Sequence, residues 1–302
     1  MQGPYGQSPI ESLADPTAPP MSDLDFLPFY RLPVGEVLGA TFTGYFAGFF
    51  KYSLLSLLVL SPTIAFAFWV LADLSMDSLW EMGQTLQYKL WFIQYSPWLL
   101  QPIATGAIIY GVFKRQRGQT ASFGRCLGVG LGRLLPLLGV GLLTGLGALA
   151  TMLPGAIGMF IPFLGIVIVL GALVFMVGFL IAASMAAPAT VVEKRGVVES
   201  FSRSFSMTRG NRWRVFGVLL VIGLIQLAIT LVIGLGLGVS ASALLLADPA
   251  SLITNLKIEV GLELGLSVIF GAINAVAAGT MFYRFKVQAE GVDEVELASV
   301  FD

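Results

Sequence analysis

The sequence predicts an all-α membrane protein, a polytopic bundle of six transmembrane helices. Three observations favour this class. Apolar residues make up 56% of the 302-residue chain and charged residues only 12%, whereas soluble domains carry about 25% charged residues. Five stretches of 20 to 59 residues contain no charged residue. The lysines and arginines are also distributed very unequally between the segments that join these stretches.

The uncharged stretches locate the spans, because a bilayer crossing needs roughly 20 apolar residues. Four stretches have the length of one span each. The longest, Leu134–Val192, has 59 residues and accommodates two, with a break expected around Pro154, Gly155, Gly158 and Pro162. We therefore expect helices at Phe50–Ala72, Trp91–Phe113, Leu134–Leu153, Phe160–Ser184, Val215–Val239 and Leu262–Tyr283.

The basic residues predict the orientation of these helices, since cytoplasmic loops carry an excess of Lys and Arg. Of the 17 lysines and arginines, 15 fall before the first span, between the second and third, between the fourth and fifth, or after the sixth. Only Lys89 and Lys257 fall on the other side. Both termini are therefore expected in the cytoplasm, and the protein in the cytoplasmic (inner) membrane of a prokaryote.

The two ends differ in composition from the centre. Residues 1–30 are rich in Pro, Gly and Ser and resemble neither a basic, apolar signal peptide nor a folded domain, so we expect a disordered cytoplasmic arm and an uncleaved first span. Residues 31–285 form the membrane domain. Residues 286–302 form a short acidic cytoplasmic tail.

A weak internal repeat organises the membrane domain. Lys51, Arg133 and Arg214 precede the first, third and fifth spans at separations of 82 and 81 residues. Ahead of each lies a stretch with helical apolar spacing. We expect three pseudo-repeated hairpins, each preceded by an amphipathic helix on the cytoplasmic surface; that basic flanks occur in any protein with paired spans stays open as the alternative. The predicted apolar stripes are Leu38, Phe42, Tyr45 and Phe49, then Phe123, Leu127 and Leu131, then Val198, Phe201 and Phe205.

Four arginines after the fourth span are candidate contacts for lipid headgroups: Arg203, Arg209, Arg212 and Arg214. Each basic residue near a leaflet attracts anionic lipid by about 1 kcal/mol. The alternative is that they only set the topology.

The composition excludes much of enzyme chemistry. There is no histidine and a single cysteine, Cys126, which removes histidine general bases, Ser-His-Asp nucleophiles, most zinc sites and any intramolecular disulfide. Within the spans, amides are the candidate polar positions: Gln101, Gln226 and Asn274. Such amides usually bond across helices, and a substrate path is the alternative. The pair Pro97 and Pro102 suggests a broken helix, which is typical of transporters.

The segment from Pro188 to Arg214 (PATVVEKRGVVESFSRSFSMTRGNRWR) carries a resemblance to a known family. Its pattern is a proline, an apolar stretch, a Glu and a Gly, then a helix with a Ser, then Gly-Asn-x-Trp. It resembles the glycerophosphoryl diester phosphodiesterase membrane-domain family and related six-span prokaryotic proteins of unknown function. The motif positions here are Pro188, Glu193, Gly196, Ser204, Gly210, Asn211 and Trp213.

The resemblance does not imply phosphodiesterase activity, because the chain lacks histidine and a region long enough for a catalytic barrel. We expect a non-enzymatic integral membrane protein with a lipid-interacting or scaffold role and no cofactor. The alternative is a small-solute or lipid transporter with a path between the hairpins. The expected partners are membrane lipids, including anionic phospholipid, and no nucleic acid; a protein partner or a homo-oligomer stays open.

The charge asymmetry generates a topology prediction. Cysteines introduced at Ser78 and Ser251 should be labelled from outside the cell, and cysteines at Ser122 and Ser202 only from inside. Accessibility to a membrane-impermeant maleimide measures this, and the reversed pattern would exclude the orientation.

Overall fold

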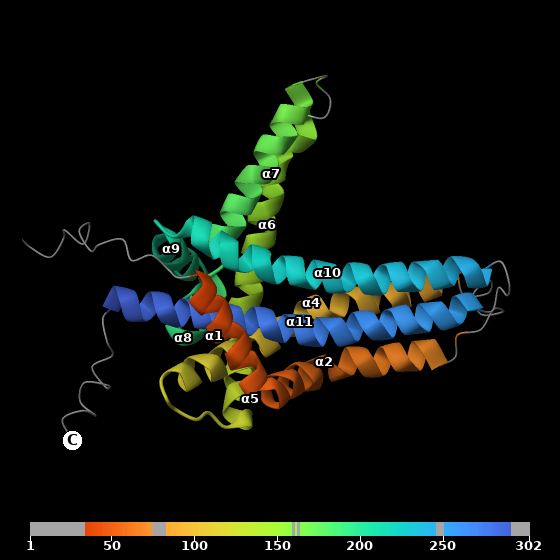
Figure 1. Ribbon diagram of the computed structural model, residues 1–302, viewed down its shortest axis with the longest axis horizontal. Helices are drawn as coiled ribbons and strands as arrows, with labels where there is room; N and C mark the ends of the chain where they lie inside the picture. Colours follow the sequence, from red (N-terminus) through yellow and green to blue (C-terminus); the bar gives the residue numbers. More distant parts are fainter. Residues whose placement is uncertain are drawn as a thin grey trace, which may run out of the picture. The chain divides into compact units, whose positions relative to one another are not determined.

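The computed structural model describes residues 34–72, 74, 83–158, 161, 164–245 and 251–290. The predicted N-terminal arm, Pro162 and residues 291–302 of the predicted tail lie outside them. The described segments consist almost entirely of helix (Figure 1), which confirms the all-α class. The helices are α1 (Val34–Ala47), α2 (Phe49–Ala72), α4 (Gly83–Gln116), α5 (Phe123–Gly132), α6 (Leu134–Gly158), α7 (Leu164–Ala183), α8 (Ala186–Val192), α9 (Val197–Thr208), α10 (Arg212–Leu245) and α11 (Ser251–Glu290).

Within the described residues, five helical segments are long and apolar enough to cross a membrane. They are α2, α6, α7 together with α8, and the greater parts of α10 and α11. These segments indicate an integral membrane protein. The sixth predicted span lies inside α4, which has 34 residues. Its glutamines and prolines make it less apolar than the other five.

Several predicted helix limits were wrong. The expected break at Pro154 lies one turn later, since α6 continues to Gly158. The expected interruption of the second span at Pro97 and Pro102 does not occur, because α4 runs through both prolines. A proline removes one backbone hydrogen bond, and neighbouring helices can compensate for that loss inside a membrane. Helices α4, α10 and α11 also extend well beyond the predicted apolar spans.

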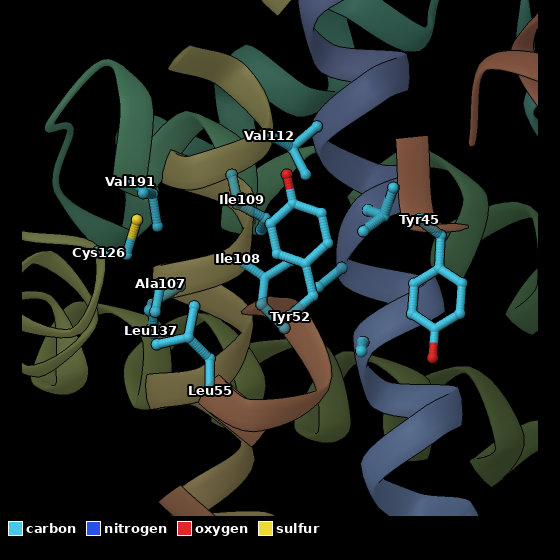
Figure 2. Packing of buried hydrophobic residues seen from close by; sticks show 13 residues of the cluster. Tyr45, Tyr52, Leu55, Ala107, Ile108, Ile109, Val112, Cys126, Leu137 and Val191 are labelled. Carbon is cyan, nitrogen blue, oxygen red and sulfur yellow. The ribbon is translucent and has the colours of Figure 1, made fainter. Parts of the chain in front are cut away.

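Helix α4 is the central element, since it packs against α2, α5, α6, α8 and α11. It runs antiparallel to α2: the start of α4 meets the end of α2 around Leu71 and Leu86, and its end meets the start of α2 around Leu55 and Ile108. Figure 2 shows the second contact, where the Tyr52 ring lies among aliphatic side chains of α4. Helix α11 lies against both α2 and α4, and α10 against α11 (Figure 1).

Helices α6 and α7 pack mainly against each other (Figure 1). The contact is close at Gly147, where a Cβ would overlap the ring of Phe179. Away from this contact the hairpin carries exposed apolar side chains, including Leu142, Ile166 and Phe175. Such a surface suits hydrocarbon, because exposed apolar area of this extent is rare on proteins in water.

The short helices α1 and α9 are alike in register. Val34 and Val197, which begin them, are 163 residues apart, as are Phe49 and Arg212, which begin the long helices that follow. The buried positions correspond at the same separation: Val37, Thr41 and Tyr45 in α1 match Ser200, Ser204 and Thr208 in α9.

The apolar stripes predicted for the short helices were therefore only partly right. In α9 the buried face consists of Ser200, Phe201, Ser204 and Thr208, and Val198 is 74% exposed. In α5 the buried residues are Cys126 and Gly130, and Leu131 is exposed. Small and hydroxyl-bearing residues make the close protein contacts because they let the backbones approach.

The contact of α5 with α4 generates a stability prediction. A Cβ on Gly130 would overlap the carbonyl oxygen of Ile103, whereas a Cβ on Gly128 in the same helix meets nothing within 4 Å. Gly130→Val should lower the free energy of unfolding by about 1–3 kcal/mol relative to Gly128→Val, which carries a similar helix-propensity change. Thermal unfolding of both variants in detergent measures the difference. Equal melting temperatures would contradict this packing.

Candidate functional site

A cavity of about 590 Å³ lies between α4, α6, the α7–α8 junction and α11. Its walls are mainly apolar, and polar side chains are few: Gln101, Thr105, Thr144, Ser184 and Ser267. A volume of this size, with apolar walls and a few polar groups, is typical of sites that bind small or amphiphilic molecules. We call it the inner cavity.

Gln101 is the most informative side chain of the inner cavity. Its Oε1 atom is buried and has no hydrogen-bond partner. Its amide packs against α11 at Gly271, where a Cβ would overlap the Gln101 Nε2 atom. A buried polar atom without a partner destabilises a fold by about 1–3 kcal/mol. The Gln101 carbonyl is thus positioned to accept a hydrogen bond from a molecule in the cavity.

Two further cavities adjoin the inner cavity along α4 and α11. One, of about 350 Å³, shares Pro97, Trp98 and Ser267 with it. The other, of about 680 Å³, lies between α4, α10 and α11 and shares Gln94, Glu259, Glu263 and Ser267 with the first. Because neighbouring cavities share lining residues, the three form one groove. We call it the α4–α11 groove.

The α4–α11 groove follows a polar stripe on α11 that the sequence analysis missed. Asn255, Glu259, Glu263, Ser267 and Gly271 recur every four residues, and the first four line the groove. Residues spaced by four lie on one face of a helix. The sequence analysis considered Glu263 alone, as an interfacial carboxylate. A search for polar residues at helical spacing across the predicted span boundary would have found the stripe.

Other intramembrane polar side chains pair with each other. Gln226 in α10 donates from Nε2 to Asn274 Oδ1 in α11 at 3.1 Å. The hydroxyls of Thr63 and Ser96 are 2.7 Å apart and join α2 to α4. Bonds of this kind hold helices together in a membrane. Of the three predicted amides, therefore, Gln101 lines the groove, and Gln226 and Asn274 connect helices.

The family-motif residues lie mostly in one structural unit around the turn from α8 to α9. Ser204 donates to the carbonyl of Ala182 and accepts from the backbone nitrogen of Met185, at the point where α7 ends. Gly196 precedes α9, and its nitrogen donates to the Glu199 carboxylate. Pro188 is buried in the first turn of α8, where proline is tolerated.

The remaining motif residues form the turn into α10. Gly210 has φ +84°, a conformation that glycine adopts without strain. The Asn211 carbonyl accepts from the nitrogens of Arg214 and Val215, and its side chain accepts from Arg214 Nη1. Trp213 is 85% exposed. Most of the motif thus shapes the backbone, and Trp213 faces outward.

The four candidate arginines have different environments. Arg203 bonds to Glu193 through Nε and Nη2, at 3.2 and 3.0 Å, and Arg195 bonds to the other oxygen of that carboxylate. Arg203 is therefore neutralised within the protein. Arg214 bonds to Asn211. Arg209 and Arg212 have exposed side chains and remain the better candidates for lipid contact.

Cys126 lies in the packing between α5, α2 and α4 (Figure 2) and is fully buried. Burial raises the pKa of its thiol, and the neighbouring Lys51 ammonium partly opposes the shift. A thiol in this state is a poor nucleophile at neutral pH. Among the described side chains, no three of His, Cys, Asp and Glu come together as metal ligands.

The helices and the groove define an all-helical integral membrane protein with a polar passage between its helices. Residues 121–285, more than half of the chain, match a family described as a domain of unknown function (DUF7847), and the chain belongs to this family. No curated protein and no solved structure matches the sequence. These comparisons show no link to the glycerophosphoryl diester phosphodiesterase membrane-domain family.

The Glu193–Arg203 pair generates a prediction. Glu193 is only 8% exposed, so Arg203→Gln removes most of the compensation of a nearly buried carboxylate. This change should lower the free energy of unfolding by about 1–2 kcal/mol, whereas Arg209→Gln, four residues before the start of the exposed cluster ends, should leave it unchanged. Melting temperatures in detergent measure both. A neutral Arg203→Gln would show that the pair does not stabilise the fold.

Proposed function

We propose that this protein is a non-enzymatic membrane protein that binds a lipid-like amphiphile in the α4–α11 groove. The observation that carries the proposal is the inner cavity, with its apolar walls and the unpartnered Gln101 carbonyl. Apolar walls favour a hydrocarbon chain, because burial stabilises it by about 25 cal/mol per Å². The few polar groups at the cavity suit one polar moiety.

The proposal includes six spans, with α4 as the sixth. In support, α4 is antiparallel to α2 and in contact with it from Leu86 to Ile109. A helix that accompanies a transmembrane neighbour over this length crosses the same hydrocarbon layer. An even number of spans also agrees with the distribution of basic residues, which favours both termini in the cytoplasm.

The proposal also retains an internal repeat of a short helix followed by a hairpin. It is supported for the first and third units by the common separation of 163 residues between helix starts and between buried positions. The unit that begins with α5 has a different spacing. The resemblance to six-span prokaryotic membrane proteins is compatible with this arrangement, and places the protein in an inner membrane.

A second candidate role is an interaction with anionic lipid at the inner leaflet. It rests on the exposed side chains of Arg209, Trp213 and Arg212 in adjacent turns. Trp is enriched at membrane interfaces, and basic residues attract anionic headgroups. Loss of phosphatidylglycerol adducts from an Arg209→Gln/Arg212→Gln variant in native mass spectrometry tests this role, and unchanged adducts would exclude it.

Two glycines of α6 provide a matched test of the amphiphile site. Gly141 lines the inner cavity and Gly145 does not, and a Cβ on either meets nothing within 4 Å. Gly141→Leu should therefore fill the cavity, while Gly145→Leu adds the same side chain elsewhere. We expect about a tenfold loss of affinity, which corresponds to 1.4 kcal/mol, for Gly141→Leu alone.

The measurement is photo-crosslinking of a diazirine-labelled monoacylglycerol in nanodiscs, with mapping of the labelled peptides. Saturable labelling of peptides that line the inner cavity, competed by unlabelled probe, is the expected result in the parent and in Gly145→Leu. If the parent shows no saturable labelling, or if Gly141→Leu labels as strongly as Gly145→Leu, the proposed site is wrong.

A further inference from the structure

We infer that the amphiphile recognised by the α4–α11 groove carries a cationic, hydrogen-bond-donating head, such as a primary amine or an ammonium group. This inference rests on the proposed function and adds the charge class of the ligand. It starts from the charges in the groove. Among the described residues that line the three cavities, Glu259 and Glu263 carry formal charges and none is Lys or Arg.

The nearest basic residue on α11 does not compensate for these carboxylates. Lys257 lies on another side of α11, where it lines a separate recess beside α2 with Phe68 and Leu71. Lys89 near the start of α4 lies over the ring of Trp69, 4.9 Å from its centre. No ion pair joins Glu259 or Glu263 to a basic side chain in the described part of the chain. The groove therefore has a negative end.

Hydrogen-bond acceptors continue from this end toward the inner cavity. The Gln101 Oε1 atom is buried without a donor. Pro97 and Pro102 lie inside α4 and cannot donate to the carbonyls of Ile93 and Trp98, four residues earlier. Both prolines and Trp98 line the groove. A head with several N–H donors complements such acceptors, whereas a phosphate or sulfate would be repelled.

The division of the groove fits one amphiphile. The inner cavity is mainly apolar and holds the chain, while Glu259, Glu263 and the Asn255 amide, whose Nδ2 is also buried and unpartnered, surround the outer part. Carboxylates beside hydrocarbon interact more strongly with a cation than carboxylates in water do. The acidic outer part therefore selects the head, and the apolar inner part binds the chain.

The test compares two diazirine-labelled probes with the same 12-carbon chain, one with an ammonium head and one with a sulfate head. The full-length protein is placed in phosphatidylcholine nanodiscs, and labelling is corrected for the partition of each probe into protein-free discs. We expect about tenfold stronger saturable labelling of groove peptides by the ammonium probe. This comparison needs only the parent protein, so it holds even if a variant fails to fold.

Variants then assign the preference to residues. Glu259→Gln/Glu263→Gln should reduce the preference to near unity by weakening ammonium labelling, and Glu36→Gln, which removes an exposed carboxylate paired with Arg284, should leave it unchanged. Equal labelling of the parent by both probes, or an unchanged preference in a folded double variant, would overturn the inference while the amphiphile site stands. Absence of saturable groove labelling by either probe would instead overturn the proposed function.

Discussion

The contact between α4 and α11 is the constraint on which the rest of the structure depends. Two glycines of α11 allow it: Gly271 receives the amide of Gln101, and Gly279 lies against Val112 and Ile109. Because α4 also touches α2, α5, α6 and α8, its distance from α11 determines where those helices lie. The same contact produces the groove, since two helices that are close at one end and separated by bulky or kinked residues at the other leave a space between them.

Polar groups in this protein divide into those that satisfy each other and those that do not. Gln226 with Asn274, Thr63 with Ser96, and Ser204 with the end of α7 all form complete bonds. Hydrocarbon offers no partner to a polar atom, so such pairs stabilise a particular helix arrangement. The unpartnered oxygen of Gln101 is different. Its position in a cavity, and not its residue type, distinguishes it from the structural amides.

The cytoplasmic short helices show how a membrane protein uses small residues. Their buried faces contain Thr41, Ser200, Ser204 and Thr208, and several large apolar side chains flank these faces and remain exposed. A hydroxyl buried against a backbone carbonyl permits a close approach and also satisfies its own donor. The exposed apolar residues are then free to contact lipid. The amphipathic pattern was thus visible in the sequence, but the side that packs against protein was not.

The sequence by itself determined the all-α class, the membrane setting and the approximate position of each long helix, because charge-free runs of this length have no stable alternative in a bilayer or in water. It also identified Gln101, Pro97 and Pro102 as unusual. Only the tertiary structure decided that α4 continues through both prolines, that Arg203 is neutralised by Glu193, and that Glu259 and Glu263 face the same groove as Gln101. These facts depend on contacts between helices that are far apart in the chain, and the spacing of residues within one helix contains no information about which neighbour its faces meet.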